Sequence, residues 1–161
     1  VIPDSHVELP VDDRSLEAMQ DDLIPYRELA LDAVMAAHVI YECFDCNTAV
    51  FSNKWIDYLR NDVKFNGVIF TDDLSMAGAG VVGGMLNRVD TAYRAGCDML
   101  LVCNAPEAVG DVLDNWHPEI DPARARRVEA LLPMEAAMDW ASLQADPKYR
   151  AARKVIAELM T

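Results

Sequence analysis

The chain has 161 residues, of which 52% are apolar and 25% are charged. This length and composition are typical of one globular domain with a substantial core, and they exclude an intrinsically disordered chain. The net charge of −13 argues against a nucleic acid or an anionic membrane as the main partner, and no apolar run approaches the ~18 residues that a membrane-spanning helix needs.

The first third of the chain combines helical and extended patterns. Ser15 is predicted to cap a short helix over residues 16–19, and a second helix is predicted over residues 26–31. Residues 33–40 are apolar on both faces, which is typical of a buried strand that helices cover on each side.

The middle of the chain repeats this alternation of strands and helices. The predicted elements are a helix over 53–60 capped by Ser52, a strand over 67–70, a helix over 87–95 ended by Gly96, a strand over 98–103, and a helix that follows Asn104 and runs to about Asp114. Asn104 is the possible cap of that last helix. This order predicts an α/β fold with parallel strands joined by right-handed crossovers.

After Trp116 the pattern is helical only. Asp121-Pro122 and Asp146-Pro147 each combine an N-cap residue with a proline in the first turn. They predict terminal helices over residues 121–132 and 147–160 that pack on the outside of the fold.

Four cysteines bear on metal and redox chemistry. Cys43 and Cys46 have CxxC spacing, but a zinc site needs a second ligand pair and the chain has none. We interpret them as reduced thiols in preference to a metal or redox site. Cys97 and Cys103 lie in or beside an apolar run and are predicted to be buried, a cysteine usage typical of a reducing compartment.

Two adjacent acids, Asp72 and Asp73, follow the strand predicted over residues 67–70. Their ordinary structural interpretation is one solvated carboxylate and one that caps the next turn. Parallel α/β folds place catalytic groups at the carboxyl ends of strands, which makes this pair a candidate for chemistry. Successive strand residues point to opposite faces, so the two acids cannot have the same role.

A second candidate group is Asp4-Ser5-His6 near the N-terminus. Its ordinary interpretation is a loop with a turn-forming aspartate and a surface histidine. The functional interpretation is a dyad, in which the Asp4 carboxylate orients the His6 imidazole and raises its basicity for proton transfer.

Four motifs occur in order along the chain: DSHVELP at 4–10, Ala37-His38, GVIFTDDLSMAGA at 67–79, and AGCD at 95–98 leading to Cys103-Asn104. Together they resemble glycoside hydrolase family 3 in its bacterial beta-N-acetylhexosaminidase branch, the cytoplasmic peptidoglycan-recycling type. The resemblance covers roughly residues 4–116.

The resemblance implies a retaining hydrolase that removes terminal beta-linked N-acetylglucosamine from muropeptides or other glycan fragments in the cytoplasm. By position, Asp72 is the nucleophile, His6 is the general acid/base and Asp4 is its orienting partner. Asp73 is then a structural neighbour. His38 is a candidate substrate-binding residue, with a satisfied core histidine as the alternative. No metal, cofactor, nucleic acid or membrane is implied.

The fold that the resemblance implies is a (β/α)8 TIM-type barrel, which typically takes ~250 residues. The three predicted strands correspond to the last three of the eight. We therefore expect the C-terminal portion of such a barrel over residues 1–118, with the catalytic loop at 1–10 and a helical extension packed on it over 119–161. The first five strands, and the sugar-binding segment that the family carries upstream, would lie outside this sequence.

This expectation leaves three hypotheses open. The chain is part of a hydrolase whose other part completes the barrel and the sugar pocket. Alternatively, it is a catalytically inactive truncated barrel that acts as a structural or interaction module. A third hypothesis is a relative that acts on unsubstituted beta-glucosides, and the Asp-Ser-His loop argues against it.

Overall fold

The computed structural model describes residue 4 and residues 7–160. The chain divides into two compact units, Val1–Leu131 and Leu132–Thr161. Each unit is described by itself, and the first contains all the strands of the described chain.

The first unit alternates short strands with helices. Its elements in chain order are β1 (Val11–Asp12), the 3-10 helix η1 (Asp21–Leu23), α1 (Ile24–Glu28), β2 (Ala33–Ala36), β3 (Ile40–Tyr41), the 3-10 helix η2 (Ala49–Phe51), α2 (Asn53–Asn61), β4 (Val68–Thr71), the 3-10 helix η3 (Ala77–Val82), α3 (Met85–Ala95), α4 (Pro106–Asn115) and α5 (Pro122–Glu129).

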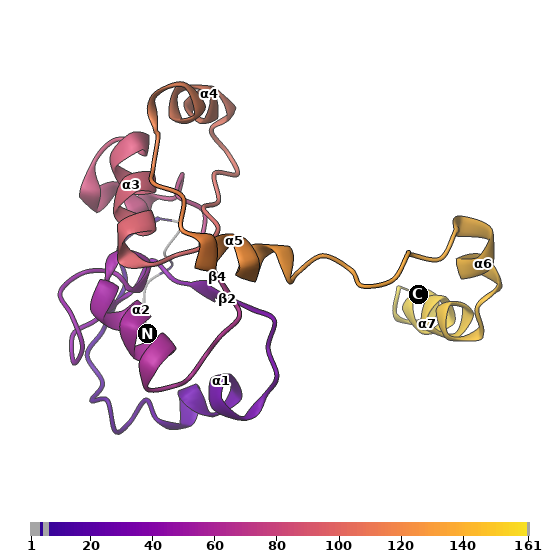
Figure 1. Cartoon of the computed structure of the whole chain (residues 1–161). Helices are drawn as coiled ribbons and strands as arrows, with labels where there is room; N and C mark the ends of the chain where they lie inside the picture. The colour runs from indigo at the N-terminus through magenta and orange to yellow at the C-terminus, as the bar shows by residue number, and fades with distance from the viewer. Residues whose placement is uncertain (1–3, 5–6, 161) are drawn as a thin grey trace. The chain divides into compact units, whose positions relative to one another are not determined.

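The centre of this unit is a parallel pair formed by β2 and β4, which lie side by side in Figure 1. Their register runs from Ala33 opposite Val68 to Ala36 opposite Thr71. The predicted α/β class is therefore confirmed in its coarse form, as a mixed fold of helices and parallel strands.

The segment over residues 98–101 lies parallel to β4 on its other side without forming a regular strand. Phe70 and Met99 form a parallel bridge, and the N–H of Thr71 donates to the Met99 carbonyl at 2.9 Å. At two positions of the hydrogen-bond ladder a side-chain oxygen replaces the backbone carbonyl as acceptor. The Ile69 N–H donates to the Asp98 carboxylate, and the Leu101 N–H donates to the Thr71 hydroxyl. The strand predicted over 98–103 is thus wrong as a regular element, although its position and direction are as expected.

The strand predicted over residues 33–40 is also shorter in the structure. β2 ends at Ala36, because the carbonyls of Ala37 and Val39 accept N–H groups from the η2 region and the chain bends there. β3 then pairs in parallel with β1, with Val11 opposite Ile40. No sequence pattern indicated this second pair.

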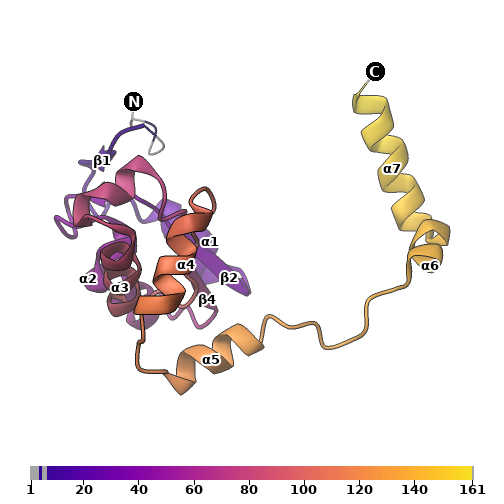
Figure 2. The ribbon, with the colours of Figure 1, turned by 90° about the horizontal axis from the view of Figure 1, so that it is seen from above.

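The helices around the strands follow the predicted signals closely in the middle of the chain. Ser52 caps α2 by accepting the Trp55 N–H at 3.1 Å, and α3 ends at Gly96 with φ +115°. A Cβ at Gly96 would lie 2.7 Å from a methyl carbon of Ile56, so only glycine fits this contact between α2 and α3. The two helices lie side by side in Figures 1 and 2.

Helix boundaries near prolines differ from the prediction. Residues 16–19 form turns, although the Ser15 hydroxyl accepts the Ala18 N–H as a cap would. α1 covers Ile24–Glu28 and not 26–31, and α4 begins at Pro106 with Ala105 as its N-cap, one residue later than a helix capped by Asn104 would begin. In both helices proline occupies the first turn, where its missing N–H costs nothing.

The core lies between β4 and the helices α2 and α3. Its completely buried members are Val50, Ile69, Leu74, Ala79, Ala92 and Cys97. α5 is held against β4 by Asp98, whose buried carboxylate pairs with Arg60 of α2 and Arg127 of α5, each at 2.6 Å.

The second unit contains two helices, α6 (Trp140–Ala145) and α7 (Pro147–Leu159). The predicted cap of α7 is confirmed, because the Asp146 carboxylate accepts the N–H groups of Lys148 and Tyr149. α6 was not predicted, and Asp139 caps it. Among the described residues, no helix is both long enough and apolar enough to cross a membrane.

Candidate active site

The carboxyl ends of β2, β4 and the 98–101 segment lie at one edge of the first unit, because all three run in the same direction. Parallel α/β folds place their chemistry at this edge. The polar residues that follow these three segments are His38, Asp72, Asp73 and Asn104.

Asp72 is the first residue after β4. Its N–H continues the ladder by donating to the Ala36 carbonyl at 3.0 Å, which fixes its backbone. The Asp72 side chain is partly exposed, and its Oδ1 accepts the N–H of Asp73 at 2.7 Å. In the part of the chain that the structure describes, Oδ2 has no hydrogen-bond partner. One carboxylate oxygen is thus held in place and the other is available.

Asp73 is buried and has the opposite environment. Its Oδ1 accepts the backbone N–H groups of Ser75 and Cys103, both at 2.9 Å, and its Oδ2 accepts the Ser75 hydroxyl and the Asn104 amide at 2.5 and 2.9 Å. Burial disfavours the charged form, but these hydrogen bonds outweigh it and hold the pKa of Asp73 below its ordinary value. This carboxylate is engaged on both oxygens by the protein.

His38 lies completely buried beneath this edge. Its Nε2 donates to the Asp73 carbonyl at 3.0 Å, and its Nδ1 has no partner within the described residues. Burial lowers the pKa of His38, against the opposing effects of the Asp73 carbonyl and the nearby Asp72 and Asp73 charges. Substrate binding by His38 stays a prediction. The structure gives His38 a hydrogen bond with Asp73 and a ring contact with Phe51.

Arg88 of α3 holds the loop that follows the two aspartates. Its guanidinium donates to the carbonyls of Leu74 and Gly83 at 2.7 and 2.8 Å. The two ends of the segment around η3 are therefore tied to one side chain, which limits how far the chain next to Asp72 can move.

The loop predicted to carry the acid/base is described only in part. Ser5 and His6 lie outside the described residues. Asp4 is exposed, and its carbonyl accepts the N–H groups of Val7 and Glu8. The base of the loop is fixed, since the Ile40 N–H donates to the Pro10 carbonyl at 3.0 Å next to the β1–β3 pair. The end of the loop at Pro10 is therefore bonded to Ile40, which lies two residues after His38 in the sequence.

The cysteines give no metal site in the described part of the chain, where no group of three or more ligating side chains occurs. Cys43 and Cys46 are exposed free thiols. Cys97 is buried as predicted, and burial raises its pKa to about 12. The predicted burial of Cys103 is wrong, since Cys103 is an exposed free thiol.

Sequence reasoning missed the group of donors around Asp73. Asn104 was interpreted as the cap of the next helix, but Ala105 is the N-cap of α4 and the Asn104 amide binds Asp73. A local signal was present in the Asp73-x-Ser75 spacing, which is typical of an aspartate that accepts hydrogen bonds two residues on. The contacts with residues 103–104 depend on the fold.

Comparisons with known proteins identify the family of the chain. The model of the glycosyl hydrolase family 3 N-terminal domain matches residues 1–131. A beta-hexosaminidase of Aromatoleum aromaticum is 49% identical over 98% of this chain, and one of Bordetella parapertussis is 42% identical over 98%. In each case the chain spans 46% of the relative, so it covers about half the length of the curated relatives it matches.

Solved structures give the same result. The crystal structure of NagZ from Neisseria gonorrhoeae in complex with N-trifluoroacetyl-D-glucosamine superposes with a TM-score of 0.77 at 36% identity, over 98% of this chain and 46% of that one. The native form of the same protein gives a TM-score of 0.78. The chain therefore belongs to glycosyl hydrolase family 3.

Proposed function

We propose that this chain carries the nucleophile and the acid/base loop of a retaining beta-N-acetylhexosaminidase, and that Asp72 is the nucleophile. The observation that carries the proposal is the contrast between two adjacent acids. Asp72 is partly exposed at the carboxyl end of β4 with one oxygen held and one available, whereas both oxygens of Asp73 are engaged by the protein.

The proposed reaction has two steps. An Asp72 oxygen attacks the anomeric carbon while His6 donates a proton to the leaving oxygen, so that a glycosyl ester forms and the glycosidic bond breaks. A water molecule then attacks the same carbon, His6 accepts its proton and the ester bond breaks. Asp4 keeps His6 oriented and has to remain ionised throughout.

The proposed substrate is a terminal beta-linked N-acetylglucosamine on peptidoglycan fragments, in cytoplasmic cell-wall recycling. Two findings support this choice of sugar. The relatives at 42–49% identity are named beta-hexosaminidases, and the NagZ structure at 36% identity holds an N-acylated glucosamine. The peptidoglycan origin of the fragments and the compartment rest on the motif resemblance.

We further propose that residues 1–118 are the C-terminal part of a (β/α)8 barrel and that residues 119–161 are a helical extension of it. The parallel order of β2, β4 and the 98–101 segment supports the barrel. The backbone groups of Leu100 and Val102 have no hydrogen-bond partners among the described residues, as expected of an edge that another strand completes. A groove of about 600 Å³, lined largely by apolar side chains, runs beside Leu100.

The test is hydrolysis of an aryl beta-N-acetylglucosaminide by the 161-residue chain, alone and mixed with the upstream half of the Aromatoleum aromaticum relative. We expect activity in at least the mixture, and Asp72→Asn is expected to lower kcat at least about a thousandfold. The matched control is Asp57→Asn, which changes an exposed aspartate on α2.

Two results would overturn the proposal. If hydrolysis persists in Asp72→Asn, another group is the nucleophile. If neither the chain nor the mixture hydrolyses the substrate, the inactive structural module becomes the better interpretation, and the open strand edge would then be its interaction surface.

A further inference from the structure

The Asp73 side chain links three parts of the fold at the edge where Asp72 lies. The carboxylate of Asp73 accepts the Cys103 N–H and the Asn104 amide from the segment beyond residues 98–101, and the backbone carbonyl of Asp73 accepts the Nε2–H of His38 from the segment after β2. Asp73 itself follows β4, so all three parallel segments meet on one residue.

The same residue reaches Asp72 through its backbone. The Asp73 N–H donates to Asp72 Oδ1 at 2.7 Å, and among the described residues this is the one hydrogen bond that fixes the direction of that carboxylate. This N–H belongs to the peptide unit between Asp72 and Asp73, which ends at the Asp73 Cα. The side-chain contacts of Asp73 with Ser75 and residues 103–104, and the contact of its backbone carbonyl with His38, hold that Cα in place. The orientation of the Asp72 carboxylate therefore depends, through the Asp73 N–H, on the positions of all three segments.

We propose that Asp73 is the positioning residue that sets the orientation of the Asp72 carboxylate, with Asn104 and His38 as its anchors. This inference rests on the proposed function of Asp72. Asp73 does not touch the substrate, because its carboxylate is buried and both oxygens are engaged. It acts by holding one oxygen of Asp72 so that the other faces the anomeric carbon.

Positioning requires the right pairing of donors and acceptors at 73 and 104, and a charge swap tests it. In Asp73→Asn an NH2 group replaces the oxygen that accepts the Asn104 amide, so this hydrogen bond is lost in the present orientation of Asn104. In Asn104→Asp two carboxylates face each other. The double variant D73N/N104D restores one donor and one acceptor at the same net charge, so it is expected to recover what each single variant loses.

Two readouts are needed. The first is the three-bond Hα–Hβ coupling of Asp72 by NMR on the 161-residue chain, which reports whether one side-chain rotamer dominates and needs no activity. We expect a single rotamer in the parent and the double variant, and averaging in each single variant. The second is kinetic, in the chain or mixture that hydrolyses: each single variant lowers kcat roughly 10- to 100-fold with KM within about twofold, and the double variant recovers.

The matched control is the Asp111–Asn115 pair on α4, in which the amide donates to Oδ1 at 2.8 Å at the surface. D111N, N115D and their double variant are expected to leave both readouts unchanged. Unchanged Asp72 couplings in Asp73→Asn and Asn104→Asp, with the variants folded, would refute the positioning role. Hydrolysis that survives Asp72→Asn would instead refute the proposed function, and the couplings would remain interpretable.

Discussion

Asp72 and Asp73 are neighbours in the sequence directly after β4, but their carboxylates have different environments, because Asp72 is partly exposed and Asp73 is buried. Alternation along a strand is enough to predict that the two differ. Which of them is buried depends on donors supplied by residues 103 and 104, thirty positions later. The resemblance predicts by position that Asp72 is the nucleophile and Asp73 its structural neighbour, and this assignment stays a proposal.

His38 is the residue whose burial is most informative about pH. Burial lowers the pKa of His38 from the ordinary 6.5, so the imidazole binds a proton less readily in the folded protein than in the unfolded chain. Below pH 6.5 the unfolded state therefore binds more protons at this site, and stability falls as the pH drops towards the folded pKa.

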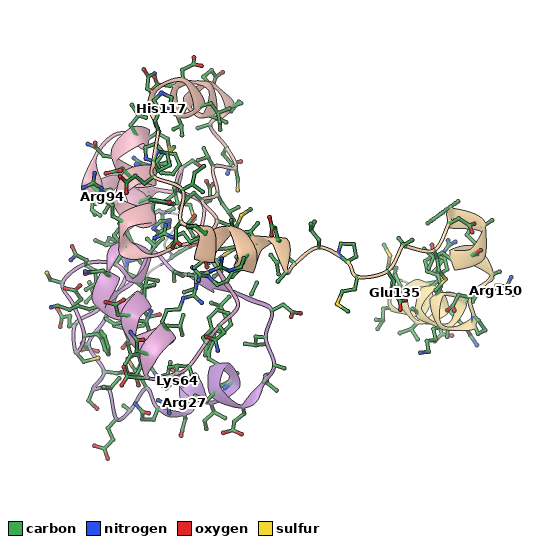
Figure 3. The ribbon with its side chains drawn as sticks, viewed as in Figure 1. Arg27, Lys64, Arg94, His117, Glu135 and Arg150 are labelled. Atoms are coloured by element: carbon green, nitrogen blue, oxygen red, sulfur yellow. The ribbon has the colours of Figure 1, made fainter. Side chains whose placement is uncertain are left out.

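We expect His38→Gln to remove this part of the pH dependence. The measurement is the free energy of unfolding by urea between pH 7 and pH 5, where the parent should lose stability and the variant should lose less. His117 is the control, because it is exposed at the surface in Figure 3 and His117→Gln should keep the slope of the parent. Equal slopes in the parent and His38→Gln would contradict the argument.

At the scale of elements, the fold is held by a buried ionic group as well as by its apolar core. Asp98 has no exposed side-chain surface and bridges Arg60 of α2 and Arg127 of α5, while its Oδ2 also accepts the Ile69 N–H of β4. Removing this carboxylate leaves two arginines in mostly buried positions without their partner.

Asp98→Ala is therefore expected to destabilise the first unit by about 3 kcal/mol or more, measured by denaturant unfolding. Arg94→Ala is the matched control. Arg94 pairs with Asp90 on the surface of α3, where Figure 3 labels the arginine, and the loss should be about 0.5 kcal/mol. A similar loss in both variants would show that the buried group has no special contribution.

The elements also show how far sequence patterns reach. Caps and a terminating glycine predicted α2, α3 and α7 well, because these signals are local: Ser52, Gly96 and Asp146 act on backbone groups within a few residues. The 98–103 strand was over-predicted because side chains of Asp98 and Thr71 replace ladder groups, and that exchange depends on the neighbouring strand. The β1–β3 pair was not predicted either. Each strand has two residues, too few to show a pattern, and only the fold brings them together.

At the scale of the whole molecule, the family match and the first compact unit have the same end, at residue 131. Residues 132–138 belong to no helix or strand, and no backbone hydrogen bond is found for them in the described structure. A protease binds its substrate as an extended chain, so a segment without backbone hydrogen bonds is the easiest to cut.

We expect thermolysin, which cuts beside apolar residues, to cleave first between residues 132 and 139. Leu132, Met134 and Met138 are 68%, 100% and 62% exposed there. Exposure alone is not sufficient, and Leu113 provides the comparison: it is 73% exposed, but its backbone lies within α4 and should resist cleavage. The fragment ending near residue 131 should keep the cooperative urea transition of the first unit. Initial cleavage at Leu113, or a fragment without a cooperative transition, would mean that the contacts within residues 1–131 do not form an independent folding unit.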